Sequence, residues 1–517
     1  MSRKWAARGL IAAAVLGAFT LSACSGPAGG TTPTTQQSTA TPVAGGTMTV
    51  ALDREVPSLD PAAGAIGQQP LFILANALYE PLMKPGKGGT VVPGLATSVE
   101  ADATGTTWTI ELPAGLTFSD GSPLTATSIK QYFEHLLDPE TKSASAGQLA
   151  QVKDMTVEND TVLTLTLHQP NADFSAQFAR GLGMIASTSA TDEFGFPLGA
   201  GPYKVEKFVG GDSITVTRND EYQGSEPAYL DSIVYAMMPD SESRLQSLQA
   251  GDVDLMWSEV ASHFEQARSN DALAVHAAPA AMTSIVLNLA NPKFADLEVR
   301  HALAQAIDRD AVNTVVNLGE GTTVDNPYAL LGELAPEITY PKYDPAAAKQ
   351  VLEGKDLAFE LTVNNRTETV QRGTVLKDML AEVGVTVTLK PLEAAEYGAT
   401  LGAHDFEAAD FVTSLFADAA GGRLVARSEA PVNFGGYANP AADAALDAAA
   451  ANTNVAERAA DLKVASQNLA DNLPILWLTA SNAGFVSKAE VAGMPDLTGI
   501  SLVSVQPASI GWAEAQQ

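Results

Sequence analysis

The stretch DSIVYAMMPDSESRLQSLQAGDVDLMW, residues 231–257, has the pattern of a strand, a helix and a second strand. A strand that returns through a helix runs parallel to the first strand, so this pattern predicts a parallel or mixed sheet. Residues 358–393 (AFELTVNNRTETVQRGTVLKDMLAEVGVTVTLKPLE) show the same order, with Gly384 at the end of the helix. Two such units far apart in the chain predict two α/β lobes.

Other segments carry local signals that place the remaining elements. Alternating Met48, Val50 and Leu52 predict a strand, and a helix capped by Thr127 is expected after the Ser-Asp-Gly turn. Alternation on both sides of an Asn-Asp pair predicts a hairpin at 157–170. Further expectations are two strands joined at Gly210-Gly211, an Ala-rich helical segment at 440–471 and a buried strand after Pro474.

Charge and cysteine content restrict the classes of function. The 517 residues include 30 Lys and Arg, 60 Asp and Glu, and one cysteine. Residues 1–23 hold three basic and no acidic side chains, so the rest carries 27 minus 60, or −33. Such a charge repels phosphate backbones, and we expect no nucleic-acid partner. With one cysteine no internal disulfide forms, so the folded cores must hold the structure.

The first residues have the pattern of a secretory signal. Residues 1–23 combine a basic start with an apolar run of about 13 residues, which is too short to span a bilayer. Leu21-Ser22-Ala23-Cys24 resembles a bacterial lipobox, in which the cysteine is lipidated and becomes the first residue. Residues 24–44 are uncharged and predict a flexible, lipid-anchored linker on the extracytoplasmic face of the cell membrane. The alternative is an ordinary signal peptide with an incidental cysteine.

Several stretches, in order along the chain, resemble one family. They include TVALDREVPSLDPA (49–62), NPKFADLEVRHALAQAIDRDAV (291–312) and YDPAAAKQVLE (343–353). They are similar to the extracellular solute-binding proteins of peptide/nickel-type ABC importers, the group that holds the oligopeptide- and dipeptide-binding proteins. The resemblance implies a periplasmic-binding-protein-like class II (cluster C) fold, with two α/β lobes, a hinge and an inserted subdomain.

The resemblance also implies a division of the chain. Lobe I would combine residues 45–83, 200–277 and 485–517, and the inserted subdomain would span 84–199. Lobe II would span 278–484, so that the hinge lies near 278 and 484. Closure of the lobes around a solute would then present a closed form to the ABC permease.

The family pattern implies ligand-binding residues, each with a simpler alternative. The candidates are Ala65, Ile66 and Gly67 in a loop, Trp257 and Ser258 at a strand end, Thr283 and Ile285 or their neighbours on the hinge strand, Arg366, Phe416 and Asp418. The loop residues would offer backbone groups, and Trp257 an apolar stacking face. The alternatives are a surface loop for 65–67 and a core position for Trp257. The register of the hinge strand stays open, because a shift of one residue reverses every assignment.

Two candidates are charged and point to peptide termini. The resemblance implies that Asp418 holds a ligand ammonium and that Arg366 binds a ligand carboxylate as a bidentate donor. The segment Leu415-Phe416-Ala417-Asp418 departs from the family's Trp-x-Ala-Asp-Tyr pattern, and AAGG follows it. A solvated loop aspartate is the alternative. The departure leaves a peptide or another small solute open as the ligand.

Catalytic and cofactor patterns are absent from the sequence. The six histidines show no metal-ligand spacing, and we expect no cofactor and no protein-held metal. The sequence contains no Gly-x-Ser-x-Gly nucleophile motif and no phosphate-binding loop, and we expect no enzyme activity. The function implied is a monomeric, lipid-anchored binding protein that delivers a peptide or similar small solute to ABC permease subunits. Alternatives are a family member for a metal chelate, opine or sugar, an anchored hydrolase, and a peptide receptor for signalling.

Overall fold

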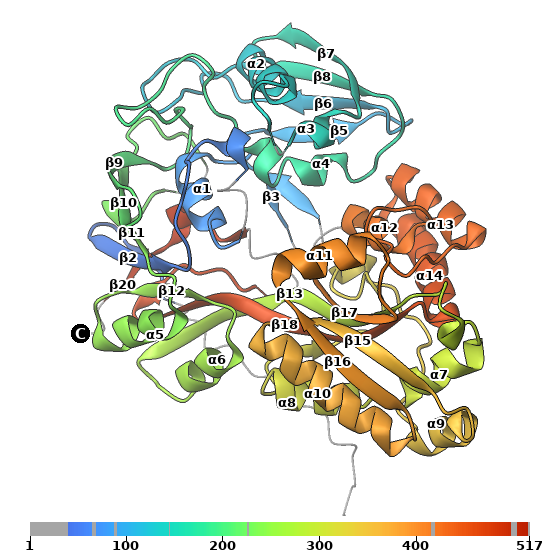
Figure 1. Ribbon diagram of the computed structural model, residues 1–517. Helices are drawn as coiled ribbons and strands as arrows, with labels where there is room; N and C mark the ends of the chain where they lie inside the picture. The colour runs from blue at the N-terminus through green and yellow to red at the C-terminus, as the bar shows by residue number, and fades with distance from the viewer. Residues whose placement is uncertain are drawn as a thin grey trace, which may run out of the picture. The chain divides into compact units, whose positions relative to one another are not determined.

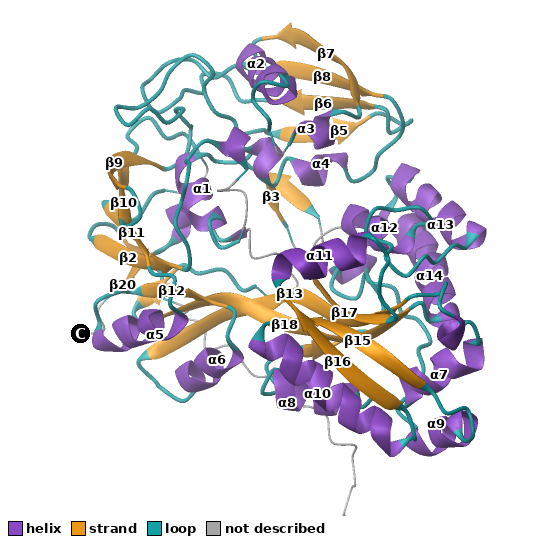
Figure 2. Cartoon of the chain, in the orientation of Figure 1, coloured by secondary structure: helices purple, strands orange, loops and turns teal. Residues whose placement is uncertain are grey.

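A computed structural model of the chain describes residues 40–64, 69–86, 90–143, 145–224, 227–414, 419–497 and 504–514. The predicted signal peptide, Cys24 and most of the predicted linker lie outside these ranges. Helices α5 (Ser241–Ala250), α6 (Ala261–Arg268), α8 (Arg309–Val316) and α10 (Thr367–Glu382) pack along strands of the large sheet from β12 (Leu255–Ser258) to β16 (Thr386–Leu392) (Figures 1 and 2).

One eleven-stranded mixed sheet links most of the folded chain (Figure 1). The strand order is β16-β15-β17-β13-β18-β12-β2-β11-β10-β9, and β14 pairs with β18 off this path. The strands are β2 (Thr47–Leu52), β9 (Tyr203–Val209), β10 (Ser213–Arg218), β11 (Ser232–Met237), β12 (Leu255–Ser258), β13 (Leu273–Leu287), β14 (Thr322–Thr323), β15 (Ala358–Asn364), β16 (Thr386–Leu392), β17 (Ala408–Thr413) and β18 (Ile475–Lys488).

The remaining strands form three small sheets. A four-stranded antiparallel sheet has the order β5-β6-β8-β7, β3 pairs with β4, and β20 lies between β1 and β19. Their bounds are β1 (Pro42–Val43), β3 (Met83–Pro85), β4 (Val91–Pro93), β5 (Ser98–Ala101), β6 (Thr107–Glu111), β7 (Val152–Asn159), β8 (Val162–Leu167), β19 (Val491–Ala492) and β20 (Gly511–Ala513).

The helices are α1 (Phe72–Leu78), α2 (Ala126–Leu137), α3 (Ala146–Leu149), α4 (Phe174–Gln177), α5 (Ser241–Ala250), α6 (Ala261–Arg268), α7 (Leu297–Gln305), α8 (Arg309–Val316), α9 (Pro345–Leu352), α10 (Thr367–Glu382), α11 (Ala394–Gly402), α12 (Ala419–Ala426), α13 (Pro440–Ala451) and α14 (Val455–Asn472). Short 3-10 turns lie at η1 (Pro61–Ala63), η3 (Gly181–Gly183), η4 (Pro292–Phe294), η5 (Gly332–Leu334) and η8 (Pro507–Ser509).

Both predicted strand-helix-strand units are present. In the first, Asp240 caps α5 by accepting a bond from Ser243 N, and Gly251 ends the helix with φ +87°. In the second, β15 pairs in parallel with β16 after crossing through α10. The first unit differs in one respect: β2 lies between β11 and β12 and is parallel to both.

The two longest strands run antiparallel through the middle of the large sheet. β13 pairs with β18 from Leu273 opposite Lys488 to Val286 opposite Ile475, with register shifts between Pro279 and Ala281 and between Met282 and Ser284. Pro279 is exposed and lies at the first shift, an irregular position of the kind where a strand accommodates proline. These two strands therefore join the two halves of the sheet, because β18 pairs with β12 on one side and β13 pairs with β17 on the other.

The predicted hairpin forms as β7 and β8, and it belongs to the four-stranded sheet. Helix α2 packs on this sheet with Ile129, Tyr132 and Phe133 buried. The expected cap at Thr127 is wrong, because the helix begins two residues earlier. Thr125 is the cap, and its side chain and Ser128 bond each other's backbone N–H groups.

Apolar clusters show which segments are packed together. One cluster joins side chains of β2, α1 and the four-stranded sheet, among them Val50, Leu74 and Ile110. Separate clusters lie around β15 and α10, and around α13 and α14. Residues 84–199 therefore share a core with β2 and α1, while α13 and α14 have a core of their own.

Candidate functional site

The predicted site residues of lobe I follow the carboxyl ends of parallel strands. Strands β11, β2 and β12 are parallel neighbours, so their carboxyl ends lie at one edge of the sheet. Trp257 and Ser258 are the last two residues of β12. Ala65, Ile66 and Gly67 follow β2 along the chain and lie outside the described residues. Ligands of open α/β sheets bind beyond such carboxyl ends.

The predicted residues of lobe II follow a second set of parallel strands. β15 lies between β16 and β17 and is parallel to both. Arg366 comes two residues after the end of β15. Phe416 and Asp418 come after β17, and both lie outside the described residues. The same chain position relative to a parallel strand thus recurs in both lobes.

Trp257 is enclosed at the end of β12. Its side chain is 2% exposed and packs edge-to-face on Phe485, with ring centroids 5.3 Å apart. Among the described residues, no acceptor bonds its buried indole N–H. A buried donor without a partner costs free energy, so this group favours any acceptor that reaches it.

Arg244 holds the strand ends that carry Trp257, and sequence reasoning missed it. Its Nε donates to Trp257 O at 3.0 Å, and its Nη1 donates to Met238 O at 2.6 Å and Pro239 O at 3.0 Å. Burial lowers the pKa of this guanidinium, while nearby carboxylates such as Asp53 oppose the shift. An arginine on the apolar face of α5, beside Leu residues, was the signal in the sequence.

Ser258 is part of a buried chain of hydrogen bonds. Val260 N donates to Ser258 Oγ at 3.1 Å, and Oγ lies 3.0 Å from His263 Nδ1. His263 Nε2 lies 3.1 Å from Glu242 Oε1. The residue types are those of a Ser-His-acid triad, but Ser258 and His263 are 0% exposed. A hydroxyl enclosed in this way has no approach for a substrate carbonyl, so the chain of bonds instead fixes the end of β12.

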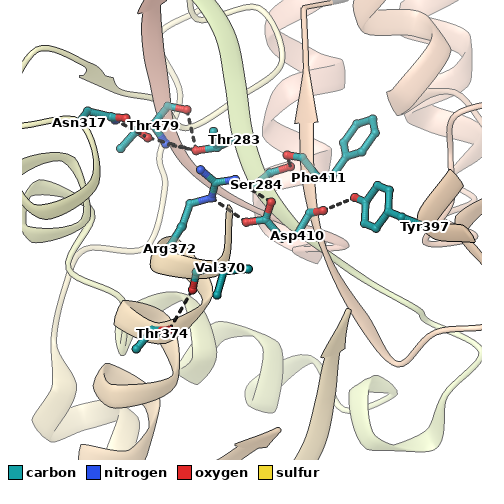
Figure 3. Close-up of polar contacts among 10 residues, drawn as sticks. All are labelled: Thr283, Ser284, Asn317, Val370, Arg372, Thr374, Tyr397, Asp410, Phe411 and Thr479. Carbon is teal, nitrogen blue, oxygen red and sulfur yellow. Dashed lines mark hydrogen bonds and ion pairs between the residues drawn. The ribbon is translucent and has the colours of Figure 1, made fainter. Parts of the chain in front are cut away.

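Thr283 is bonded across the central strands (Figure 3). Its Oγ1 donates to Thr479 O at 2.9 Å, and Asn317 Nδ2 donates to Thr479 Oγ1 at 3.1 Å. The side chain of Ile285 is 3% exposed and belongs to the apolar cluster around β15. The structure thus places Thr283 in a polar link between β13, β18 and the end of α8, and Ile285 in a core.

A buried ion pair lies next to these strands. Arg372 donates to both carboxylate oxygens of Asp410, at 2.6 and 2.7 Å, and Tyr397 Oη donates to Asp410 O (Figure 3). Burial acts to lower the pKa of Arg372, and the facing Asp410 carboxylate outweighs it and raises that pKa. The side chains are 4% and 0% exposed, so the pair is a fixed part of lobe II.

Among the predicted site residues that the structure describes, Arg366 is the exposed one. It precedes α10, and its backbone N donates to Asn364 Oδ1 at 3.2 Å. Within the described ranges, no side chain bonds its guanidinium. Next to it, Asn365 Nδ2 donates to Glu393 Oε1 at 2.5 Å and ties the ends of β15 and β16.

A family profile described as "Bacterial extracellular solute-binding proteins, family 5 Middle" matches residues 90–420. The chain belongs to this family. Its members are solute-binding proteins, and the predicted membership is confirmed.

Curated relatives of this family 5 chain are similar over most of its length. The glutathione-binding protein GsiB of Pectobacterium atrosepticum is 25% identical over 477 residues, which are 86% of this chain and 91% of that protein. The probable di/tripeptide-binding protein 5 of Pseudomonas aeruginosa is 27% identical over 419 residues, 72% of this chain and 77% of that one.

Solved structures of family 5 proteins share the fold. The periplasmic murein tripeptide-binding protein MppA, in its unliganded open form, matches with a TM-score of 0.81 at 20% identity. The match covers 92% of this chain and 99% of that one. The predicted class II, two-lobe α/β fold is therefore confirmed, while the exact domain boundaries stay predictions.

We searched the described part of this family 5 chain for groups of possible metal ligands and for membrane-spanning helices. Its His, Cys, Asp and Glu side chains nowhere gather in threes with the geometry of a metal site. None of its helices combines the length and the apolar character needed to cross a bilayer. The ligand roles of the predicted site residues stay predictions.

Proposed function

We propose that this chain is the lipid-anchored substrate-binding protein of an ABC importer. It captures a short peptide or a similar small solute between its lobes and delivers it to the permease subunits. Cys24 carries the lipid, residues 24–44 form the tether, and the protein works as a monomer on the extracytoplasmic face of the membrane.

One observation carries the proposal. In both lobes predicted ligand residues lie at or just after the carboxyl ends of parallel strands, and β13, which carries Thr283 and Ile285, connects these two sets of strands together with β18. An α/β sheet binds its ligands beyond this edge. Membership of family 5 supports a solute as the ligand, and the names of the glutathione- and di/tripeptide-binding relatives support a peptide.

Two of the candidate side chains match chemical groups of a short peptide. The exposed guanidinium of Arg366 suits a carboxylate, which it can bind with two parallel hydrogen bonds. Asp418 suits an ammonium group, while Trp257, enclosed in the apolar cluster that includes β2 and α1, supports the end of β12 beside the site. Because the segment around Phe416 departs from the peptide-binding pattern, a metal chelate, an opine or a sugar is the alternative solute.

The first experiment identifies the solute. Mass spectrometry of small molecules released from the purified protein should find a short peptide, and thermal unfolding with trialanine should show stabilisation. A ligand at 100 times its Kd adds about 2.7 kcal/mol. Absence of any peptide from the extract, together with no shift from any short peptide, would contradict the peptide assignment.

The role of Arg366 can be separated from general charge effects. Wild-type protein should bind trialanine more tightly than its C-terminal amide, by about tenfold or more, because a charged hydrogen bond contributes about 1.5–3 kcal/mol. Arg366→Ala should remove this preference. Lys377→Ala, an equal charge change at an exposed position of the same helix, should keep it. Loss of the preference in both variants would refute a specific role for Arg366.

Anchoring is tested by fractionation of cells that express the full chain. Wild-type protein should partition with the membrane and incorporate a labelled fatty acid, and Cys24→Ala should lose the label. If the wild type is secreted without label, the ordinary signal peptide is correct.

A further inference from the structure

Within the described residues, the inserted segment 84–199 contacts lobe II at a small polar site that is distant in sequence from the central strands. Arg458 in the first turn of α14 pairs with Asp173, which precedes α4. The paired side chains are 10% and 9% exposed. Next to them, Ala172 N donates to Ala450 O at 2.7 Å. We call these four residues the clasp.

The backbone bond of the clasp uses a group that the helix leaves open. Ala450 lies in the last turn of α13, where carbonyl groups have no partner within the helix. Ala172 N therefore satisfies an acceptor of lobe II directly. A carbonyl oxygen of the neighbouring residue, Ala451, lies 3.6 Å from where a Cβ on Gly105 would stand, so the β5–β6 turn approaches the same helix end.

The clasp joins two parts that have separate apolar cores. The inserted segment shares its core with β2 and α1 of lobe I, as Ile110 and Val50 show. Helices α13 and α14 pack in another cluster, which includes Leu446 and Leu462. No sheet in the described chain pairs a strand of 84–199 with a strand of lobe II. The contact can therefore open without breaking a core or a sheet.

The chemistry of the clasp suits a contact that opens and closes. When the two surfaces meet, Asp173 and Arg458 lose water, and the attraction between them roughly offsets that cost. When the surfaces part, both side chains regain water. Among the described residues, Arg458 Nε has no partner even in the joined form, which further limits the net gain. Removal of either charge abolishes the attraction across the contact and leaves the remaining charge without this counter-charge, so it disfavours the joined form.

We propose that the clasp is a charge-controlled closure between the inserted segment and lobe II. The balance between Asp173 and Arg458 sets how much of the time these two parts are joined. Only the role of this closure rests on the proposed function: it would control how long a solute stays between the lobes.

The test needs no solute, so it can fail or succeed independently of the proposed function. In full-length protein with Cys24→Ala no cysteine remains, because Cys24 is the only one. Ala172→Cys and Ala451→Cys then place two thiols at the clasp, and Ala451 is exposed. The rate of cross-linking by a short bifunctional maleimide measures how often the contact forms.

The matched control is Ala172→Cys with Ala441→Cys. Ala441 is also exposed on α13, but it lies ten residues away, about 15 Å along the helix. The clasp pair should react much faster than this control pair. Equal rates would show that the contact does not form in solution, and would overturn the proposal.

Variants of Asp173 and Arg458 test whether their charges set how often the contact forms. Asp173→Asn or Arg458→Gln should slow cross-linking of the clasp pair by about tenfold or more, because each variant removes the attraction between the two side chains while the remaining charge still loses water in the joined form. The exchange Asp173→Arg with Arg458→Asp should restore most of the rate. Unchanged rates in both single variants would overturn the proposal, and a folded second variant keeps the test valid if the first does not fold.

Discussion

Two ion pairs link segments assigned to different lobes, and they lie in very different surroundings. Near the central strands, Arg268 of α6 bonds both carboxylate oxygens of Glu320 at 3.0–3.2 Å. Asn482 of β18 donates to Glu320 O, and β14, two residues on, pairs with β18. At the clasp, Asp173 and Arg458 meet without any shared strand.

The difference teaches that the position of an ion pair decides what it contributes. Glu320 is held against β18 by its own backbone, so the pair with Arg268 persists as long as the sheet does. The clasp pair is more enclosed, with side chains 9–10% exposed against 9–23%, but its partners can part. If one clasp charge is lost, the two surfaces can separate and the remaining side chain regains water. The loss of folding free energy is therefore limited to the free energy of separating the two surfaces. The first pair therefore adds to folding stability, and the second to a conformational balance.

The largest effect is expected where an ion pair cannot separate at all. Arg372 and Asp410 are both buried within lobe II. Asp410→Asn should lower the free energy of unfolding by about 3–5 kcal/mol, because Arg372 would stay buried without its counter-charge. Urea unfolding followed by circular dichroism measures this loss.

The control for that variant replaces both partners. Arg372→Met with Asp410→Leu should recover most of the lost stability, since apolar side chains of similar size need no partner. Suppose that the single variant is as stable as wild type. Then a buried ion pair whose partners cannot move apart is not especially costly to break, and the comparison is wrong.

The second effect is a loss of folding stability in acid, and it comes from the central strands near the Arg268–Glu320 pair. His276 on β13 is 2% exposed, and burial lowers its pKa from 6.5 to about 4. Below pH 6.5 the unfolded chain binds a proton that the folded chain refuses, so stability is lost as the pH falls toward 4. The full loss is about 3 kcal/mol, and nothing is lost to this group above pH 6.5.

Unfolding free energies of His276→Gln between pH 7 and 4 check this. The variant should show a flatter decline with acid than wild type, while His135→Gln, at an exposed position, should follow wild type. Identical slopes for wild type and His276→Gln would remove His276 as the source of acid sensitivity in this region.

The smallest effect compares the two inter-lobe pairs directly. Arg268→Gln should cost about 1–2 kcal/mol of unfolding free energy, because Glu320 is mostly enclosed and stays in place. Asp173→Asn should cost less than about 1 kcal/mol, because Arg458 can return to water when the clasp opens. A larger loss from Asp173→Asn than from Arg268→Gln would reverse the comparison.

Local patterns in the sequence were sufficient for the elements. Alternation and the helix end at Gly384 are set by neighbours in the chain, and the predicted units at 231–257 and 358–393 formed. The cap at Thr127 was wrong by two residues, because Thr125 and Ser128 form the reciprocal pair of bonds. Which strand lies beside which was harder, since β2 enters between β11 and β12 from almost 200 residues away.

The places of the candidate residues relative to the strands were predictable from sequence, while their ligand roles stay predictions. Residues at a strand end, such as Ser258, or just after one, such as Arg366, are recognisable from sequence. Arg244 was missed because its three acceptors are carbonyl groups, which every residue has. The clasp was missed because Asp173 and Arg458 are separated by 285 positions, and neither lies in a marked local pattern.

The late position of β18 has a consequence for biogenesis. This strand pairs with β12, β13 and β14, yet it begins only at Ile475. The ribosome must therefore make nearly the whole chain before the central pairing can form, and contacts so far apart in sequence form slowly. The central part of the largest sheet is therefore completed late in synthesis, after shorter-range units such as the β7–β8 hairpin and β15-α10-β16 have been made.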